Sequence, residues 1–539
     1  MGVRGFQRAA VILAVLTVVL TWPQAGWPGT RVADHRDAFF SMWRLAWVAH
    51  ALETSPRHLY DSNIYYPEPN TFTLSDATLL QGIIAAPFLW LGVSPAWIYN
   101  LLLLGGITVS GLAMFVLVRY LTRDEHAAVV AGAVYTLLPY RVEHFVHFEM
   151  QWTMFIPLAF WAVHRAFDES SWRFGVLAGV FVWLQFVAGM YNATFLALVL
   201  PVLTLLVALS ARHRLIGLMA VMAGGVVAML LTYPLARPYI RNSSQLTRST
   251  DAVDRFSAQP SSYISAPRRN RLWGWTGQRF GGNERHLFPG AVAIGLALVG
   301  LACGARRVVA VYVAIGLLAM ELSLGFNGHL YGWVYRHAWP VQSLRAIARF
   351  SIIAFSALSV IAGYGIACVR RRCDNRRFAS WIPACAIALL VVDTFSAPMA
   401  LTPVSVTPPS VYSTLKQLPD GAVVELPALR PDVSEVFDPR YQFWSRVHWK
   451  PLVNGYSGGT PPGYVETQRL LETFPDTASL QRLVDLNVRY VVVHAQLYPP
   501  GSTADLFARI RTRPELISRG TYADWIGGAE LFELHDRKR

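Results

Sequence analysis

The sequence predicts an α-helical, polytopic membrane protein that ends in a small extracytoplasmic α/β domain. Of the 539 residues, 54% are hydrophobic and only 15% are charged, whereas soluble proteins carry about 25% charged residues. Apolar runs long enough to cross a membrane recur along residues 1–400. From residue 401 the hydrophobic density falls, prolines appear, and short Val-rich segments predict strands.

About 11 segments are expected to form transmembrane helices, with bounds that are good to a few residues. They cover residues 9–22, 97–118, 126–142, 151–168, 173–189, 192–210, 215–236, 288–305, 308–325, 350–369 and 379–398. The first segment is interpreted as an uncleaved span, because no convincing signal-peptide cleavage pattern follows it. These segments predict a transmembrane domain over residues 1–400.

Arginine placement predicts how the spans are oriented. Arginine clusters follow the second, sixth and tenth predicted spans. They are Arg119 with Arg123, Arg212 with Arg214, and the cluster at residues 370–372. All of these clusters fall on one side of the membrane, and that side is the cytoplasm if the N-terminus is cytoplasmic. We therefore expect a multi-pass protein of the bacterial inner (plasma) membrane, with the C-terminal domain outside the cytoplasm.

The first outer loop and the tail are the longest exported segments. The loop, residues 23–96, contains an apolar stretch at 79–91 in which Pro87 favours a re-entrant or surface helix over a full span. In the tail, strands are expected at 422–427, 489–494 and 529–535, and a partial helix at 470–486. They predict an α/β domain over residues 401–539. The exported parts contain no cysteine, so no disulfide is expected there.

The charge balance limits the choice of partners. The formal net charge is +14, and lysine occurs only at positions 416, 450 and 538. Arginine binds phosphate through two parallel hydrogen bonds, although a GC-rich genome also favours arginine codons. The charge is spread over membrane loops, where it suits anionic lipids and argues against nucleic acid. No Walker loop, nucleophile elbow or zincin motif is present in the sequence.

Two acidic residues, Asp34 and Asp37, follow the first apolar run and are expected at the membrane surface. A carboxylate there costs free energy unless it is solvated, paired or used in function. The pair suits a general base with a helper, or a base with a metal ligand. The alternative is that Asp37 only caps the helix that follows it.

An aromatic helix is expected directly after these acids, over residues 38–47. Phe40, Trp43 and Trp47 fall at positions i, i+3 and i+7, which places them on one helix face. This pattern is typical of a helix that lies in the membrane interface with its rings at headgroup depth.

Arginines on the outer side are candidates for binding a lipid phosphate. Arg345 and Arg349 are four residues apart, which on a helix places both guanidinium groups on one face at the mouth of the tenth span. Loop 237–287 is rich in arginine, including Arg268 and Arg269, on the side where positive charge is normally depleted. The alternatives are snorkelling at a span end and the weaker charge bias of long loops.

A further set of residues is expected to line a polar substrate cavity. His144, His147 and Gln151 are spaced at i, i+3 and i+7. His-x-x-His alone is weak evidence for a metal, so no metal ligands are assigned, and such residues are often simply interfacial. The remaining cavity candidates are Arg44, Asp76, Tyr191 and Glu284.

Several motifs resemble a bacterial branch of the GT-C class of membrane glycosyltransferases. They are Asp37-Ala-Phe-Phe-Ser-Met-Trp-Arg-Leu-Ala-Trp47, Pro139-Tyr-Arg-Val-Glu-His144, Leu287-Phe-Pro-Gly290, Ser343-Leu-Arg-Ala-Ile-Ala-Arg-Phe350 and Val453-Asn-Gly-Tyr456. The resemblance implies a polyprenyl-phosphate sugar donor and a glycan, lipid or protein acceptor. It also implies an inverting transfer, with Asp37 or Asp34 as the base and with Arg345 and Arg349 on the lipid phosphate.

Three points are open from the sequence alone. The spacing Asp-His-Arg-Asp departs from the best-known acidic pairs of the class, so the base is not settled between the two acids, and a divalent metal ion is neither required nor excluded. A transporter or flippase of lipid-linked glycans would also use membrane acids and arginines, although no repeated halves are visible. A non-catalytic accessory protein that binds lipid-linked sugar is a third interpretation.

Overall fold

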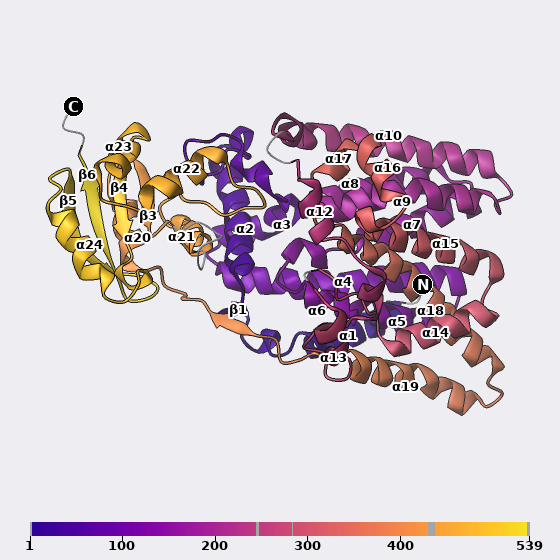
Figure 1. Ribbon diagram of the computed structural model, residues 1–539. Helices are drawn as coiled ribbons and strands as arrows, with labels where there is room; N and C mark the ends of the chain where they lie inside the picture. The colour runs from indigo at the N-terminus through magenta and orange to yellow at the C-terminus, as the bar shows by residue number, and fades with distance from the viewer. Residues whose placement is uncertain (1–2, 244–246, 283, 429–436, 536–539) are drawn as a thin grey trace. The chain divides into compact units, whose positions relative to one another are not determined.

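The computed structural model describes residues 3–243, 247–282, 284–428 and 437–535 (Figure 1). Its contacts divide the chain into two compact units. The helical unit comprises Met1–Pro28 and Asn100–Leu401, and the mixed unit comprises Gly29–Tyr99 and Thr402–Arg539. The sequence places the first outer loop, residues 23–96, in the transmembrane domain. In the structure, most of this loop clusters with the C-terminal residues.

A helix lies at each position where the sequence predicts a span. These helices are α1 (Val3–Leu20), α4 (Pro95–Thr122), α5 (Glu125–Thr136), α7 (Phe155–Asp168), α8 (Trp172–Ala188), α9 (Met190–Ala208), α10 (Arg214–Arg241), α14 (Ala291–Cys303), α15 (Arg306–Ser323), α18 (Ser351–Arg372) and α19 (Arg376–Thr394). Among the described residues, six segments are long and apolar enough to cross a membrane. The polytopic helical fold is thus confirmed, while the count of 11 spans stays a prediction.

Small residues let helices of this unit approach closely, as is usual where lipid supplies no hydrophobic driving force. Gly175 and Gly179 of α8 lie directly against the main chain of Ala220 and Gly224 of α10. A Cβ atom on Gly179 would meet the carbonyl group of Gly224. The pairing of α8 with α10 therefore depends on the missing side chains.

Helix α18 lies among α5, α14 and α15 and is buried along most of its length. A disulfide joins Cys303 at the end of α14 to Cys368 in α18. From the sequence, both cysteines are expected within spans or on their cytoplasmic side, and this bond is not predicted. The prediction covers only the exported parts, where no disulfide is expected.

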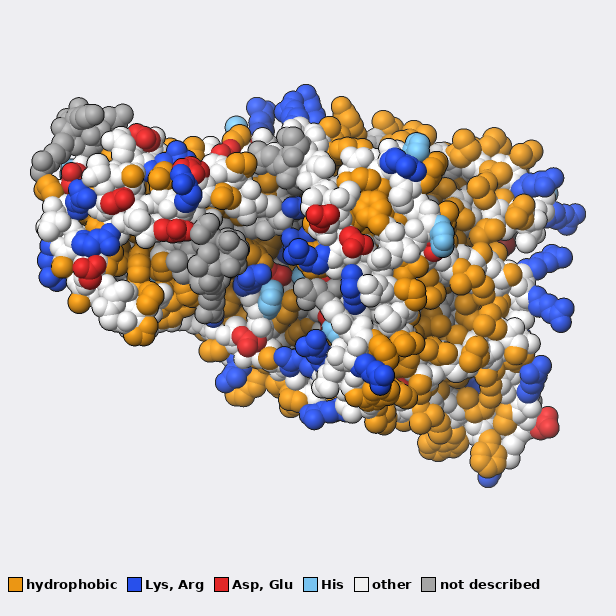
Figure 2. Space-filling model, in the orientation of Figure 1, with side chains coloured by type: hydrophobic (Ala, Val, Ile, Leu, Met, Phe, Trp, Pro, Cys, Tyr) orange, Lys and Arg blue, Asp and Glu red, His pale blue; other side chains and the backbone are white. Residues whose placement is uncertain are grey.

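The surface of the helical unit is apolar over the face seen in Figure 2, and Lys and Arg side chains gather at one end of it, on the right. On α10 the exposed large hydrophobic side chains are Leu215, Ile216, Met219, Met222, Val226, Met229, Leu230, Leu231, Tyr233 and Ile240. A continuous apolar surface of this kind suits contact with lipid. A cationic end is what the arginine pattern predicts for cytoplasmic turns, and the orientation itself stays a prediction.

The C-terminal part of the mixed unit is built on a four-stranded sheet of order β3-β4-β6-β5. The strands are β3 (Ala422–Leu426), β4 (Val488–Val493), β5 (Leu516–Ala523) and β6 (Gly528–Leu534). β3 and β4 are parallel, and β6 is antiparallel to both β4 and β5. The three strands expected from the sequence are present. The sequence does not predict β5, because Ser518, Arg519 and Thr521 interrupt its apolar residues, and only Leu516 is buried.

Helices connect and flank these strands. They are α20 (Ser410–Gln417), α21 (Asp438–Ser445), α22 (Pro462–Leu471), α23 (Thr477–Asp485) and α24 (Ser502–Arg511). The helix expected at 470–486 is therefore split, with α22 ending and α23 beginning inside that range.

The first outer loop supplies β1 (Arg31–Ala33), α2 (Arg36–Thr54) and α3 (Leu79–Trp90). The rings of α2 are covered by protein rather than open to lipid headgroups, and their depth in the membrane stays a prediction. Trp43 is fully buried, and Trp47 packs edge-on against Trp449 with ring centroids 5.7 Å apart. The i, i+3, i+7 spacing of aromatic residues is therefore also found in a helix whose aromatic face packs against protein. α3 has 12 residues and spans about 18 Å, too short for a bilayer core of about 30 Å.

Candidate functional site

Asp37 lies in the first turn of α2, but it is not the cap of that helix. His35 is the N-cap residue, and its Nδ1 accepts a hydrogen bond from the main-chain N–H of Asp37 over 3.1 Å. The capping alternative for Asp37 is therefore wrong, and its carboxylate has another contact. Oδ1 of Asp37 accepts a hydrogen bond from the hydroxyl of Tyr456 over 2.6 Å. Asp34, by contrast, is exposed.

Sequence reasoning missed Tyr456, although the motif Val453-Asn-Gly-Tyr456 contains it. Tyr456 and Asp37 are 419 positions apart, so no local spacing could connect the two. The only sequence signal for Tyr456 is the motif itself, a polar turn that ends in an aromatic residue. The composition of the surrounding domain is otherwise ordinary.

Arg44 and Asp76, two of the predicted cavity residues, are neighbours in the mixed unit. Arg44 is only 2% exposed, and its Nη1 donates to the main-chain oxygen of Asp76 over 2.7 Å. Its Nη2 donates to Ser41 Oγ over 2.9 Å, and the guanidinium carbon lies 4.5 Å from the centre of the Phe40 ring. These contacts hold the segment around Asp76 against α2. A role in a substrate cavity stays a prediction for both residues.

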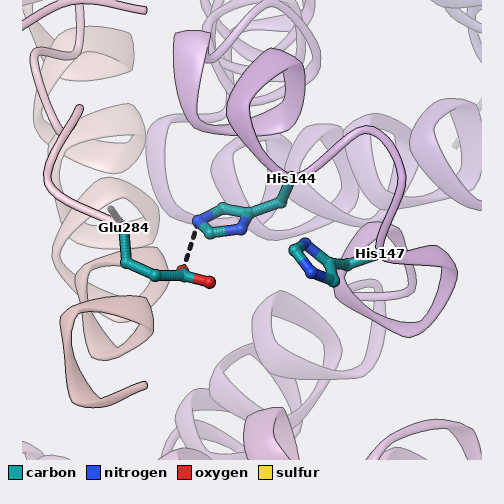
Figure 3. A group of neighbouring side chains, drawn as sticks. All are labelled: His144, His147 and Glu284. Carbon is teal, nitrogen blue, oxygen red and sulfur yellow. Dashed lines mark ion pairs between the residues drawn. The ribbon is translucent and has the colours of Figure 1, made fainter. Parts of the chain in front are cut away.

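A second cluster lies in the helical unit, where His144, His147 and Glu284 point toward one another (Figure 3). One donor atom from each side chain lies within 4.8 Å of the other two. His144 Nε2 is 3.4 Å from Glu284 Oε2. The structure thus brings together three predicted residues from two loops that are distant in the sequence.

The helical spacing assumed for this cluster is wrong, because the chain turns between short helices. His144 follows α6 (Pro139–Glu143), and the 3-10 helix η4 (Phe148–Gln151) begins after His147. Gln151 is fully buried, and its Nε2 donates to the carbonyl of His144 over 2.6 Å. Gln151 therefore fixes the turn that carries both histidines.

Glu284 forms a two-pronged ion pair with Arg349. Oε2 accepts from Arg349 Nε over 3.0 Å, and Oε1 accepts from Nη2 over 2.5 Å. Arg349 Nη2 also lies 3.3 Å from His147 Nε2. Glu284 has a positive φ of 63°, a conformation that costs of order 1–3 kcal/mol outside glycine and is held only by its surroundings. The ion pair is one such constraint.

The titration states of this cluster follow from its burial. Burial lowers the pKa of His144 to about 3, and the nearby charge of Glu284 offsets this only in part. Burial would raise the pKa of Glu284, but the positive charge of Arg349 overcomes it and holds that pKa well below its usual range. At neutral pH the cluster contains a carboxylate, a guanidinium and a neutral His144.

Tyr191, at the start of α9, connects this cluster to further arginines. The guanidinium carbon of Arg349 lies 5.2 Å from the centre of the Tyr191 ring. Tyr191 Oη accepts a hydrogen bond from the main-chain N–H of Arg345 over 3.2 Å. Burial lowers the pKa of Arg248, and the positive charge of Arg345 adds to the effect. Arg248 was not singled out from the sequence, because it is one of many arginines in its loop.

The expected helix carrying Arg345 and Arg349 is not present. Arg345 is exposed in irregular chain, and Arg349 lies in the 3-10 helix η7 (Ile347–Phe350) just before α18. Both residues nevertheless contact Tyr191, Arg345 through its main-chain N–H and Arg349 through its guanidinium group. Arg268 and Arg269 are exposed, and Arg269 Nη1 donates to the carbonyl of Pro398 over 3.4 Å. Their phosphate-binding role stays a prediction.

Two histidines and a glutamate form a donor set that suits a transition metal. In the structure, however, both oxygens of Glu284 and Nε2 of His147 lie against the guanidinium of Arg349. The guanidinium of Arg349 thus already engages two of these three donors. The cluster as arranged fits an ion pair better than a metal site.

No protein-family model and no curated protein sequence matches the chain. Among solved structures, the arabinofuranosyltransferase AftD from Mycobacteria matches 100% of this chain and 40% of its own, with a TM-score of 0.64 at 13% identity. The oligosaccharyltransferase AglB from Archaeoglobus fulgidus matches 91% and 69%, with a TM-score of 0.47 at 11% identity. ArnT from Cupriavidus metallidurans matches 98% of both chains, with a TM-score of 0.42 at 12% identity.

Of these three structures, AftD is similar enough for its fold to be compared, and this chain spans about two fifths of that protein. The match nevertheless extends over the whole of the present chain, through both the helical and the mixed unit. The chain therefore has the GT-C fold that its sequence predicts, in a multi-pass membrane protein.

Proposed function

We propose that this protein is a membrane glycosyltransferase that moves a sugar from a polyprenyl-phosphate donor to a hydroxyl acceptor on the extracytoplasmic face. The observation that carries the proposal is the placement of Asp37. It lies outside the predicted spans, does not cap its helix, and has its carboxylate held by a side-chain donor. The fold likeness to a known arabinofuranosyltransferase supports the reaction class.

In the proposed reaction, Asp37 takes the proton of the acceptor hydroxyl. The acceptor oxygen then attacks the anomeric carbon from the face opposite the phosphate, so the configuration inverts. The bond from the anomeric carbon to the phosphate oxygen breaks, and its electron pair leaves with the lipid phosphate. Asp37 is preferred to Asp34 as the base, because Asp34 is exposed to solvent.

Arginine chemistry supports the assignment of the leaving group. Arg345 and Arg349 meet at Tyr191, and Arg248 lies close enough for its charge to interact with Arg345. Guanidinium groups bind phosphate through paired hydrogen bonds, and their charge stabilises a phosphate as negative charge develops on it. We propose that these arginines bind the departing lipid phosphate.

The test is sugar transfer by the purified full-length protein in lipid nanodiscs. The donors are polyprenyl-phosphate arabinofuranose, mannose and glucose, each labelled in the sugar, with short glycans as acceptors. Asp37→Asn is expected to lower kcat at least about 100-fold, as loss of a general base does. Asp34→Asn is the matched control, because it removes the same charge three residues away, and it is expected to keep most of the activity.

Two results would contradict the proposal. One is full transfer activity in both Asp37→Asn and Asp34→Asn. The other is a wild-type protein that transfers none of the three sugars but moves a fluorescent polyprenyl-linked sugar across sealed vesicles. The second result would replace the enzyme with the flippase alternative.

A further inference from the structure

The side chain of Tyr456 lies against the carboxylate of Asp37 in a short hydrogen bond. Tyr456 Oη donates to Asp37 Oδ1 over 2.6 Å, a length typical of a hydroxyl that donates to an ionised oxygen. Burial, and then the negative charge of Asp37, raise the pKa of Tyr456 above its ordinary value. The tyrosine hydroxyl therefore keeps its proton and is the donor.

Tyr456 is itself held on three sides. Its main-chain N–H donates to Gln442 Oε1 over 2.9 Å. Its ring meets the Phe40 ring edge-on, with centroids 5.5 Å apart, and the guanidinium carbon of Arg36 lies 5.4 Å from its centre. Arg36 and Phe40 lie on either side of Asp37 along α2. The hydroxyl is therefore fixed relative to the helix that carries the acid.

The loop that carries Tyr456 is tied into the interior of the mixed unit by Asn454, which is fully buried. Asn454 Oδ1 accepts from the main-chain N–H of Glu425 over 2.7 Å, and its Nδ2 donates to the carbonyl of Glu425 over 2.9 Å. The same Nδ2 donates to Asp438 Oδ1 over 3.0 Å. Gly455 leaves no room for a side chain, because a Cβ atom would lie 2.7 Å from the Tyr65 ring. The loop is thus a rigid support.

We propose that Tyr456 is a positioning residue for sugar transfer, which holds Oδ1 of Asp37 so that Oδ2, which lies 3.6 Å from His35 Nδ1, is aligned to take the proton of the acceptor hydroxyl. This inference rests on the proposed function, in which Asp37 is the base. The acceptor O–H bond breaks and its proton goes to Asp37 Oδ2, while the acceptor oxygen bonds to the anomeric carbon. The anomeric carbon–phosphate bond breaks, and its electron pair leaves with the phosphate.

The proposal gives a C-terminal residue an indirect part in catalysis, through the orientation of Asp37. A base that turns freely reaches the reactive geometry less often, and small losses of alignment cost up to about 100-fold in rate. Tyr456 acts only through Asp37 in this scheme. Its removal is therefore expected to lower the rate of the chemical step and not the affinity for the donor.

The test uses Tyr456→Phe in the full-length protein in nanodiscs, which removes one oxygen and keeps the ring against Phe40. We expect kcat to fall about tenfold, with KM for the polyprenyl-phosphate donor changed less than about twofold. Tyr412→Phe is the matched control. Tyr412 Oη also donates to a buried carboxylate in the same unit, that of Glu425, over 2.8 Å. This control is expected to keep the wild-type kcat.

A double variant shows whether Tyr456 acts through Asp37. Asp37→Asn with Tyr456→Phe is expected to be no slower than Asp37→Asn alone, because a positioning residue has nothing left to position. Wild-type kcat in Tyr456→Phe, beside an inactive Asp37→Asn, would overturn this inference and leave the proposed function in place. A loss confined to KM would also overturn it. Full activity in Asp37→Asn with loss in Asp34→Asn would overturn this inference by moving the base to Asp34, whereas full activity in both variants would overturn the proposed function on which it rests.

Discussion

Glu284 holds Arg349 through both of its carboxylate oxygens, over 3.0 Å and 2.5 Å. The two residues are 65 positions apart, and both side chains are about nine-tenths buried. A paired geometry of this kind is stronger than a single contact and fixes the plane of the guanidinium. The position of Arg349 beside Tyr191 and His147 therefore depends on Glu284.

Glu284→Gln is expected to destabilise the protein by about 3 kcal/mol, because it leaves the guanidinium of Arg349 buried without its counter-charge. Thermal unfolding in detergent measures this loss. The double variant Glu284→Gln with Arg349→Gln is expected to be less destabilised than the sum of the two single variants, since it removes both charges. Strict additivity of the two losses would show that the ion pair contributes nothing to stability.

How much of this fold the sequence predicts is clearest in α2. The spacing of Phe40, Trp43 and Trp47 predicts a helix with one aromatic face, and that helix is present. The spacing contains no information on what covers the face, because lipid headgroups and a protein core select the same rings. The covering residues, such as Trp449, come from about 400 positions away. Long apolar helices were predictable because their signal is local.

In the candidate site, too, local features could be predicted from the sequence, whereas contacts between distant residues could not. Asp37, His144, Glu284 and Arg349 could be selected by type and by their place outside the spans, but their partners could not. The four-residue spacing of Arg345 and Arg349 suggests one helix face only if the chain is helical there, and it is not. The contact between Arg349 and Glu284 depends on the packing of two loops, for which the sequence has no local pattern.

Arg349 lies against Glu284 and His147, two of the three side chains that with His144 could hold a metal ion. Arg349→Ala is therefore expected to create a zinc site, because it removes a positive charge and releases the oxygens of Glu284. Titration calorimetry should show Zn²⁺ binding at least about tenfold tighter than in the wild-type protein. Adding His144→Ala removes one ligand and should abolish the gain. Equal Zn²⁺ affinity in Arg349→Ala and wild type would contradict this account.

A buried histidine in the mixed unit sets a pH dependence of stability. His494 is fully buried, with Nδ1 2.6 Å from Asp524 Oδ2 and Nε2 2.7 Å from Glu425 Oε2. Burial would lower the pKa of His494, but hydrogen bonds to Asp524 and Glu425 outweigh it and raise that pKa above its ordinary value. Burial raises the pKa of Asp524, yet the contact with His494 leaves it lowered.

The sign of the effect follows from linkage. A histidine whose folded pKa is raised contributes its full stability below its unfolded pKa of about 6.5, and loses it as pH rises through the folded value. His494→Gln is therefore expected to be destabilised by about 3 kcal/mol near pH 5.5. Its difference from wild type should shrink as the pH rises above about 6.5. Thermal unfolding from pH 5 to 9 measures this difference.

Asp438 adds a second pH dependence to the stability of the same unit. Burial raises its pKa to about 7, so its ionisation opposes folding as pH rises from about 4 toward 7. This contribution is present in wild type and in His494→Gln alike, and only the smaller part of it that depends on the charge of Glu425 differs between them. A difference between the two proteins that stays constant with pH, or grows as pH rises, would contradict the assigned state of His494.

Two helix glycines, Gly179 in α8 and Gly225 in α10, separate the effect of close helix packing from the general effect of replacing a glycine. A Cβ on Gly179 of α8 would meet the carbonyl of Gly224, whereas a Cβ on Gly225 would meet nothing within 4 Å. Gly179→Ala is expected to destabilise the helical unit by about 1–3 kcal/mol, because α8 and α10 must move apart. Gly225→Ala should be neutral or stabilising by up to about 1 kcal/mol, since alanine favours helix. Thermal unfolding in detergent compares the two variants. Equal stability of the Gly179→Ala and Gly225→Ala variants would mean that α8 and α10 are not in close contact at Gly179 and Gly224.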